Sequence, residues 1–170
     1  MSKIIVYENF NFQGRSKEFT SDVPDLNAEG FNDNISSIKV IGNPWLAYTD
    51  CIYKGELYIY EEGEYPVVEI NDSISSLQLV RGDLKDPQIC LYEYAHYGGR
   101  RISLTEEKDL NETSFNDTAC SQKVIKGVWV LYEHGNRGGE KMIVKAGDNV
   151  VKYDWWYKKV SHVRPLKAGK

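Results

Sequence analysis

Two short runs of oxygen-bearing side chains in this sequence have the composition of a cation-binding loop. The first, residues 32–37, reads Asn-Asp-Asn-Ile-Ser-Ser, and the second, residues 71–76, reads Asn-Asp-Ser-Ile-Ser-Ser. Carboxylate, amide, hydroxyl and backbone carbonyl oxygens are the hard ligands that Ca²⁺ takes, in a flexible set of roughly six to eight. The composition fits a calcium loop, but a run of this kind taken alone favours a simple turn, because the same residue types hydrogen-bond nearby backbone amides without any metal.

Two further copies of the run are altered at positions that matter for a cation. The copy at residues 116–121 carries Cys120 where the other runs have a hydroxyl, and sulfur is a poor ligand for a hard cation. The copy at residues 157–162 brings in Lys158 and Lys159, whose ammonium groups would repel Ca²⁺. We therefore expect any metal binding to be confined to the N-terminal half of the chain.

The runs belong to a fourfold repeat of about forty residues. In each repeat a tyrosine is followed seven places later by a glycine: Tyr7 and Gly14, Tyr48 and Gly55, Tyr92 and Gly99, Tyr132 and Gly139. The first three tyrosines also have an aromatic residue five places on, whereas the fourth has Arg137. Repetition at this period indicates supersecondary units that pack on one another. We expect the glycine to adopt a positive φ, or to leave room for the tyrosine ring folded over a hairpin.

Each repeat is predicted to consist of short strands. It opens with a β-branched and aromatic run such as residues 4–7, passes through a Gly-containing bend to a second apolar run, and closes with a third run such as residues 37–40. Roughly four strands per repeat is compatible with a Greek key. A forty-residue unit is too small to bury an adequate core alone, so the units are expected to pair into β-sandwiches.

The most polar and turn-rich connection, residues 81–88, divides the repeats into two pairs. The prediction is therefore an all-β protein of two Greek-key sandwich domains, residues 1–82 with motifs 1 and 2 and residues 88–170 with motifs 3 and 4. The dense aromatic cluster at residues 154–159 belongs to the second domain. We expect at least one of its tryptophans to lie in the core, and exposed members beside lysines would mark a protein, glycan or membrane contact.

Composition and motif content argue against several functional classes. A net charge of −4 gives no attraction for nucleic acid, and no apolar run is long enough for a signal-peptide core or a membrane span. The sequence has no Gly-x-Ser-x-Gly, His-Glu-x-x-His or phosphate-binding Gly-rich motif, so we expect no enzymatic activity. Three cysteines cannot all pair within the chain, which favours reduced thiols and a cytoplasmic location, although secretion without a recognisable signal peptide stays open.

Three hairpins with a Tyr-x4-aromatic-x-Gly pattern, a fourth with Arg137 at the aromatic place, and the Asn/Asp-Asn/Asp-x-x-Ser/Thr-Ser runs that follow them resemble the βγ-crystallins over residues 4–166. Residues 62–66, Glu-Gly-Glu-Tyr-Pro, look like the turn in the second motif of vertebrate crystallins. Residues 17–24 and 161–166 are similar to the crystallin portion of amphibian and fish epidermis differentiation-specific proteins. In that group, the resemblance implies, the crystallin part can precede an aerolysin-like pore-forming region.

The resemblance also implies which residues would bind calcium. In calcium-binding βγ-crystallins the run supplies a side chain from its first pair, a backbone carbonyl from its third place and a hydroxyl from its fifth, and hairpin loops supply the remaining ligands. Carried to this chain, the candidates in the runs are Asp33, Asn34, Ser36, Asp72, Ser73 and Ser75. The hairpin candidates are Glu8 or Asn9 and Thr49 or Asp50.

The function expected from these patterns is a non-enzymatic, calcium-binding crystallin with a structural or interaction role in epithelial tissue, present as a monomer or weak dimer. One alternative is a metal-free structural crystallin, since lens-type crystallins keep a similar frame without depending on metal. A second is a targeting module that engages a protein partner or an attached aerolysin-like pore-forming domain.

Overall fold

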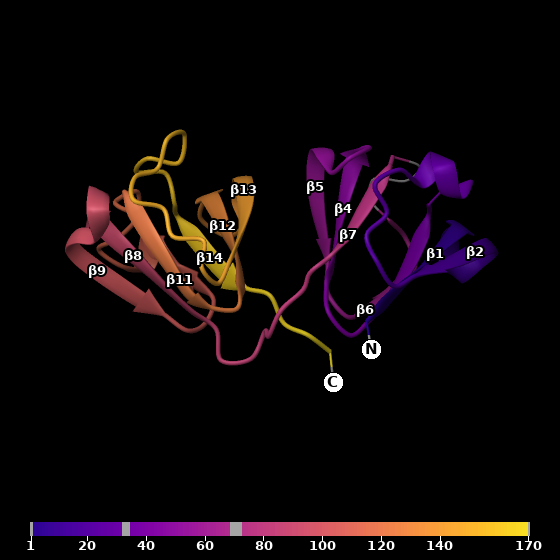
Figure 1. Ribbon diagram of the computed structural model, residues 1–170, viewed down its shortest axis with the longest axis horizontal. Coiled ribbons are helices and arrows are strands. Elements are labelled where there is room, and N and C mark those ends of the chain that lie inside the picture. Colours follow the sequence, from indigo (N-terminus) through magenta and orange to yellow (C-terminus); the bar gives the residue numbers. More distant parts are fainter. Residues whose placement is uncertain (1, 32–34, 69–72, 170) are drawn as a thin grey trace. The chain divides into compact units, whose positions relative to one another are not determined.

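The computed structural model describes residues 2–31, 35–68 and 73–169, and it divides into two units that are built from antiparallel strands (Figure 1). The first unit contains Met1–Arg81 and residues 167–169, and the second contains Gly82–Leu166. The sequence placed residues 167–169 in the second domain, but the structure groups them with the first, where the Lys167 backbone amide donates to the Glu61 carboxylate at 2.9 Å.

The strands of the first unit are β1 Lys3–Asn9, β2 Gln13–Phe19, β3 Ser37–Ile41, β4 Trp45–Asp50, β5 Lys54–Tyr60, β6 Gly63–Tyr65 and β7 Ser76–Leu79. Two short 3₁₀ helices, η1 Phe10–Phe12 and η2 Leu26–Glu29, lie between them. Those of the second unit are β8 Gln88–Tyr94, β9 Gly98–Leu104, β10 Lys108–Asp109, β11 Ser121–Lys126, β12 Val128–His134, β13 Gly138–Lys145 and β14 His162–Pro165, with η3 Ala95–Tyr97 and η4 Leu110–Glu112.

In each unit the two motifs exchange chain segments. One sheet of the first unit has the order β2-β1-β3-β6, so a strand of motif 2 completes the sheet of motif 1. In return, Val23 of motif 1 forms a bridge with Leu77 of β7 in the sheet β5-β4-β7. The second unit shows the same relation, with β10 of motif 3 in the sheet β10-β14-β12-β13 and Val150 of motif 4 bridged to Gln122 of the sheet β11-β8-β9. Neither motif of a pair can therefore complete its sheet alone.

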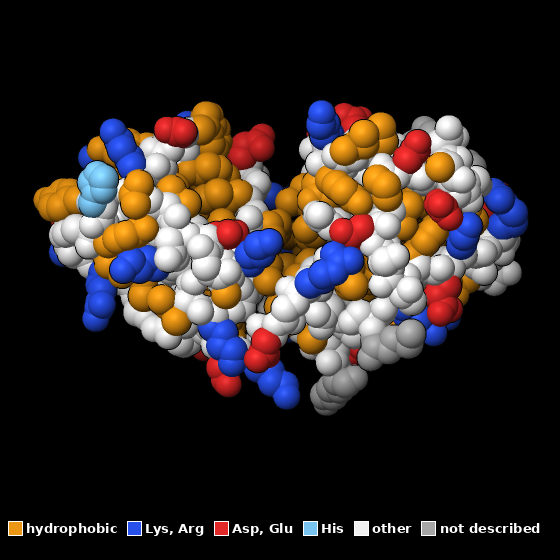
Figure 2. All heavy atoms as spheres, viewed as in Figure 1, with side chains coloured by type: hydrophobic (Ala, Val, Ile, Leu, Met, Phe, Trp, Pro, Cys, Tyr) orange, Lys and Arg blue, Asp and Glu red, His pale blue; other side chains and the backbone are white. Residues whose placement is uncertain are grey.

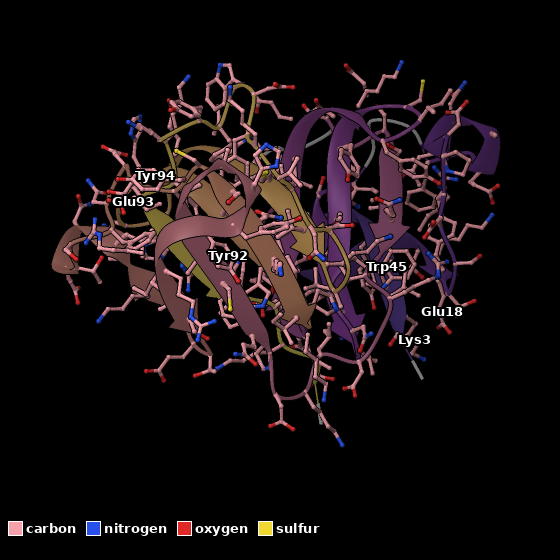
Figure 3. The ribbon with its side chains drawn as sticks, turned by 60° about the vertical axis from the view of Figure 1, so that its left-hand side comes forward. Lys3, Glu18, Trp45, Tyr92, Glu93 and Tyr94 are labelled. Carbon is pink, nitrogen blue, oxygen red and sulfur yellow. The ribbon has the colours of Figure 1, made fainter. Side chains whose placement is uncertain are left out.

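Alternation along the central strands places one apolar face of each sheet in the core. In the first unit, Ile4 and Val6 of β1 are fully buried with Trp45 of β4, which is labelled in Figure 3. In the second unit, Trp129 and Leu131 of β12 are fully buried in the same way. Truncation of a buried tryptophan typically costs about 3–5 kcal/mol, so these two indoles anchor their units.

The recurring glycine confirms the hairpin prediction. Gly14, Gly55, Gly99 and Gly139 have φ values of +80°, +84°, +73° and +72°. A Cβ atom at Gly55 would lie 2.3 Å from Thr49 Oγ1, so the side chains that follow the tyrosine, and not its ring, fill the space. The predicted all-β architecture of two Greek-key sandwiches is confirmed.

Candidate metal centre

The residue at the fifth place of each run occupies an equivalent position in all four motifs. Its backbone amide donates to the carbonyl of the repeat tyrosine at 2.8–2.9 Å: Ser36 to Tyr7, Ser75 to Tyr48, Cys120 to Tyr92 and Ser161 to Tyr132. All four of these residues are buried, with at most 8% of their surface exposed. The fifth place of each run is thus held against the central strand of its own motif, and the alignment of the four copies at this place is a structural equivalence.

The serine at the sixth place has a structural role in three motifs. The Ser37 hydroxyl donates to the Asn9 carbonyl at 2.6 Å and accepts from the Phe12 amide at 2.9 Å. Ser76 makes the same pair of bonds to Asp50 and Tyr53, and Ser121 makes them to Tyr94 and Tyr97. Each of these serines is fully buried, so it closes the hairpin bend and is not available to a cation.

Replacing Ser76 by Ala is expected to lower the free energy of unfolding of the first unit by about 1–3 kcal/mol, because two partly buried hydrogen bonds, to the Asp50 carbonyl and from the Tyr53 amide, are lost at about 0.5–1.5 kcal/mol each. Urea denaturation followed by tyrosine and tryptophan fluorescence measures this change. Ser16→Ala, at an exposed position of β2, is the matched control, with an expected change within about 0.5 kcal/mol. Equal changes in the two variants would contradict the structural role.

The candidate ligands of the first unit are only partly covered by the structure. Asp33, Asn34 and Asp72 lie outside the described residues. Ser36 and Ser75 are buried and Ser73 is partly buried. In the parts of the chain that the structure describes, no group of three or more His, Cys, Asp or Glu side chains is positioned to hold a metal ion.

The hairpin candidates already take part in the folded bends. Glu8 forms an ion pair with Arg15 at 3.1 Å, and Thr49 Oγ1 accepts from the Glu56 amide at 2.9 Å. In motifs 3 and 4 the residue equivalent to Thr49 is a glutamate, Glu93 or Glu133, which accepts a backbone amide in the same way at 3.2 Å. The carbonyl of Asn9 and that of Asp50 both accept from the sixth-place serines.

The second unit shows how two runs meet. Asp117, at the second place of the third run, accepts a hydrogen bond from the hydroxyl of Ser161 at the fifth place of the fourth run, at 2.8 Å. The two residues are 44 positions apart in sequence. A carboxylate from one motif and a hydroxyl from its partner motif therefore face each other, a relation that sequence reasoning within single runs does not reveal.

The fourth hairpin contains a polar cluster that the sequence-based prediction missed. His162 takes the place of the sixth-place serine and packs edge-on against Tyr132, with ring centroids 5.6 Å apart, where the other motifs have an aromatic pair such as Tyr7 and Phe12. Its Nε2 lies 2.8 Å from Glu107 Oε2. Glu107 also accepts two bonds from Arg137, at 2.6 and 2.8 Å.

Asp109 completes this cluster. Its carboxylate accepts from the backbone amides of Asn111 and Asn136, at 3.0 and 3.1 Å, and the first of these bonds is the main cause that lowers the pKa of Asp109. It lies 3.8 Å from His162 Nδ1, which has no hydrogen-bond partner among the described residues. The sequence signal that could have identified the cluster is that both Arg137 and His162 differ from the repeat pattern. The equivalent residues of the other motifs, such as Phe12 and Ser37, contact each other.

Hydrogen bonds from Arg137 are the main cause that lowers the pKa of Glu107 to about 2, and those from His162 act in the same direction. The cluster therefore keeps an anionic carboxylate between two cationic or hydrogen-bonding partners at neutral pH. It closes the fourth hairpin by charge, where a neutral serine closes the others.

The comparisons with known proteins follow the same division into two units. The model of the Beta/Gamma crystallin family matches residues 3–80 and 88–167. The chain belongs to the βγ-crystallin family. An epidermal differentiation-specific protein of Cynops pyrrhogaster is 47% identical over 172 residues, covering 100% of this chain and 51% of that protein. Beta-crystallin B1 of Sus scrofa is 32% identical, covering 90% of this chain and 64% of that protein.

A solved βγ-crystallin from an archaeon is 40% identical and covers 46% of this crystallin and 98% of that chain, with a TM-score of 0.44. The chain spans about half the length of the Cynops relative and less than two thirds of the Sus one. The predicted resemblance to the βγ-crystallins and to the epidermal group is confirmed. In the described residues no helix is long and apolar enough to cross a membrane.

Proposed function

We propose that this crystallin is a structural calcium-binding protein whose first unit holds the ion in the loops of its paired motifs. The observation that carries the proposal is the contact between Asp117 and Ser161, which joins the second place of one run to the fifth place of the partner run. In the second unit the pair is closed by a hydrogen bond. In the first unit the runs keep the full set of oxygen donors that Ca²⁺ uses.

The repeat transfers this relation to the first unit. Asp33 corresponds to Asp117 and Ser75 corresponds to Ser161, so these two residues are expected to contribute to one site. The pseudo-symmetric site would take Asp72 and Ser36. Asn34 and Ser73, at the third place of each run, would contribute through their backbone carbonyls, as the family pattern implies. Each proposed site is thus shared by two motifs, and calcium would tie them together.

The charge distribution supports a cation in the first unit. Residues 1–81 contain thirteen Asp and Glu against six Lys and Arg, whereas residues 82–166 contain twelve against thirteen. A local excess of negative charge raises the concentration of cations near a surface. At Glu8, Ca²⁺ would have to compete with Arg15 for the carboxylate. Of the hairpin candidates, we therefore expect Asn9 and Asp50 to be ligands in preference to Glu8.

Isothermal titration of the full chain with Ca²⁺ tests the proposal. Two sites are expected, and Asp33→Ala or Ser75→Ala should each weaken the same site. The double variant Asp33→Ala/Ser75→Ala changes two residues of one site, so the other site should be retained. Asp33→Ala/Ser36→Ala changes one residue of each site and should weaken both, because residues of one site couple and residues of separate sites do not.

Asp117→Ala, at the equivalent place in the second unit, is the control and should leave the titration unchanged. A chain that takes up no Ca²⁺, or whose binding is unaffected by Asp33→Ala and Asp72→Ala, would refute the proposal. The metal-free structural crystallin would then be the function that the fold supports.

The targeting role, with a protein partner or an attached aerolysin-like pore-forming domain, stays a prediction. The same is true of a monomeric or weakly dimeric state, a cytoplasmic location, the absence of enzymatic activity and a role in epithelial tissue. The similarity to an epidermal differentiation-specific protein over the whole chain is the observation that favours the epithelial role.

A further inference from the structure

The long connection between β13 and β14 carries an exposed aromatic surface that the calcium proposal does not use. Within it, residues 150–160 form what we call the aromatic-lysine loop. Tyr153 and Val160 are buried in the core of the second unit, and Trp156 packs against that core. The prediction that at least one tryptophan of this cluster belongs to the core is therefore supported, and the loop is fixed from inside.

Between these anchors, three large apolar side chains point outward. Val151 is 48% exposed, Trp155 is 49% exposed and Tyr157 is 42% exposed. Tyr94, which is 61% exposed and is labelled in Figure 3, lies at the end of β8. The bend that follows it is a neighbour of the loop, because the amide of His96 in that bend donates to the Val151 carbonyl at 2.7 Å. Figure 2 shows hydrophobic side chains gathered along the upper face of the second unit, where Figure 1 draws this connection.

Lysines surround the exposed rings. Lys159 Nζ lies 3.7 Å from the centroid of the Trp155 ring, and the ammonium groups of Lys158 and Lys152 lie 5.5 and 5.9 Å from that of Tyr157. At these distances the cations are attracted to the ring faces, which holds the charges at the level of the aromatic surface. The loop contains three lysines and one acidic residue, Asp154.

The equivalent segment of the first unit serves as an internal comparison. The Asn11 amide donates to the Pro66 carbonyl as the His96 amide does to that of Val151, so Pro66 and Val151 are equivalent. Residues 65–74, which correspond to the aromatic-lysine loop, contain two acidic residues, Glu69 and Asp72, and no Lys or Arg. The equivalent segment of the first unit thus has neither lysines nor tryptophans, so the Greek-key frame does not require them.

We propose that the aromatic-lysine loop is a docking surface for a bilayer that contains anionic phospholipids. Tryptophan and tyrosine favour the level of the lipid headgroups, because one end of the side chain is apolar and the other can hydrogen-bond. Lysines at the same level are attracted by the negative surface potential of anionic lipids and can extend their ammonium groups to phosphates. The combination fits peripheral binding by insertion of Trp155 and Tyr157 between headgroups.

Flotation of the full chain with vesicles of phosphatidylcholine and phosphatidylserine, in the presence of EGTA, tests this inference. Binding is expected at 30% phosphatidylserine and should fall steeply with added salt and with neutral vesicles. Replacing Lys152, Lys158 and Lys159 together by Gln should weaken binding roughly ten- to hundredfold. The double variant Trp155→Ala/Tyr157→Ala should weaken it roughly tenfold or more.

Matched controls separate the loop from general charge and hydrophobicity. Replacing Lys85, Lys108 and Lys126 by Gln removes the same charge from elsewhere in the second unit, and Val67→Ala with Ile125→Ala removes exposed apolar groups outside the loop. Both controls should bind as the unaltered chain does. Thermal unfolding of every variant checks that the fold is kept.

Four results would overturn the inference. One is an absence of binding to anionic vesicles, and another is binding that the loop variants leave unchanged. The third is dimerisation of the chain without lipid that Trp155→Ala abolishes, which would assign the surface to a second copy. Binding that appears only with Ca²⁺ and is insensitive to the loop would place the lipid contact in the first unit.

Discussion

Calcium is expected to raise the midpoint of thermal unfolding of the first unit by roughly 10 to 20 °C and to leave that of the second unit unchanged. A ligand that binds only the folded state at about a hundred times its dissociation constant stabilises that state by about 2.7 kcal/mol. For a domain of roughly eighty residues, each kcal/mol corresponds to a shift of about 4–8 °C. Differential scanning calorimetry of the full chain, with Ca²⁺ and with EGTA, measures both transitions in one sample.

The physical reason is that each proposed site is shared by two motifs. The unfolded chain cannot present oxygens from residues about forty positions apart together, so the ion favours the paired state. Asp33→Ala/Asp72→Ala should abolish the shift, whereas Asp117→Ala should preserve it. If Ca²⁺ binds in the titration but neither transition moves, the ion is not a structural one.

The fold was predictable because its signal is local and repeated. The apolar runs that begin the four repeats fall in β1, β4, β8 and β12, and the recurring glycines have the positive φ expected at the bends. The exchange of segments between motifs was not predictable. β6 pairs with β3 of the other motif and not with its own hairpin. Contacts across the sandwich decide this pairing, and the three residues of β6 are too few to carry a periodic pattern that would reveal it.

The candidate site was predictable to the level of residue types. The runs were identified from their composition. The different roles of the adjacent residues Ser36 and Ser37 could not be predicted, because they depend on contacts with distant parts of the chain. The carbonyl of Ser36 accepts from the amide of Val68 in the partner motif, whereas the hydroxyl of Ser37 closes a hairpin bend 28 residues earlier in the chain. The cluster around Glu107 was missed because its members come from both motifs of the second unit and become neighbours only through the exchanged strand β10.

Replacing Glu107 by Gln is expected to destabilise the second unit at pH 7 by about 1–2 kcal/mol. Hydrogen bonds to charged groups contribute about 1.5–3 kcal/mol, and the lower part of that range applies because the side chain of Glu107 is 38% exposed. The loss leaves Arg137 without its bidentate partner and the buried His162 beside a neutral amide. Urea denaturation followed by tryptophan fluorescence, to which the second unit contributes three of the four tryptophans, measures the change.

The pH dependence of the stability of the second unit distinguishes closure of the fourth hairpin by charge from closure by packing. The folded state lowers the pKa of Glu107 from 4.5 to about 2, so the stabilisation is fully present above about pH 4.5 and is lost as the pH falls toward 2. Glu107→Gln should therefore flatten this part of the acid unfolding curve. Glu112→Gln is the control, because Glu112 is exposed and pairs with Lys108 at 3.7 Å, an ion pair of at most about 1 kcal/mol. If the acid unfolding curve of Glu107→Gln is as steep as that of the unaltered chain, the fourth hairpin is closed by packing of His162 on Tyr132 and not by charge.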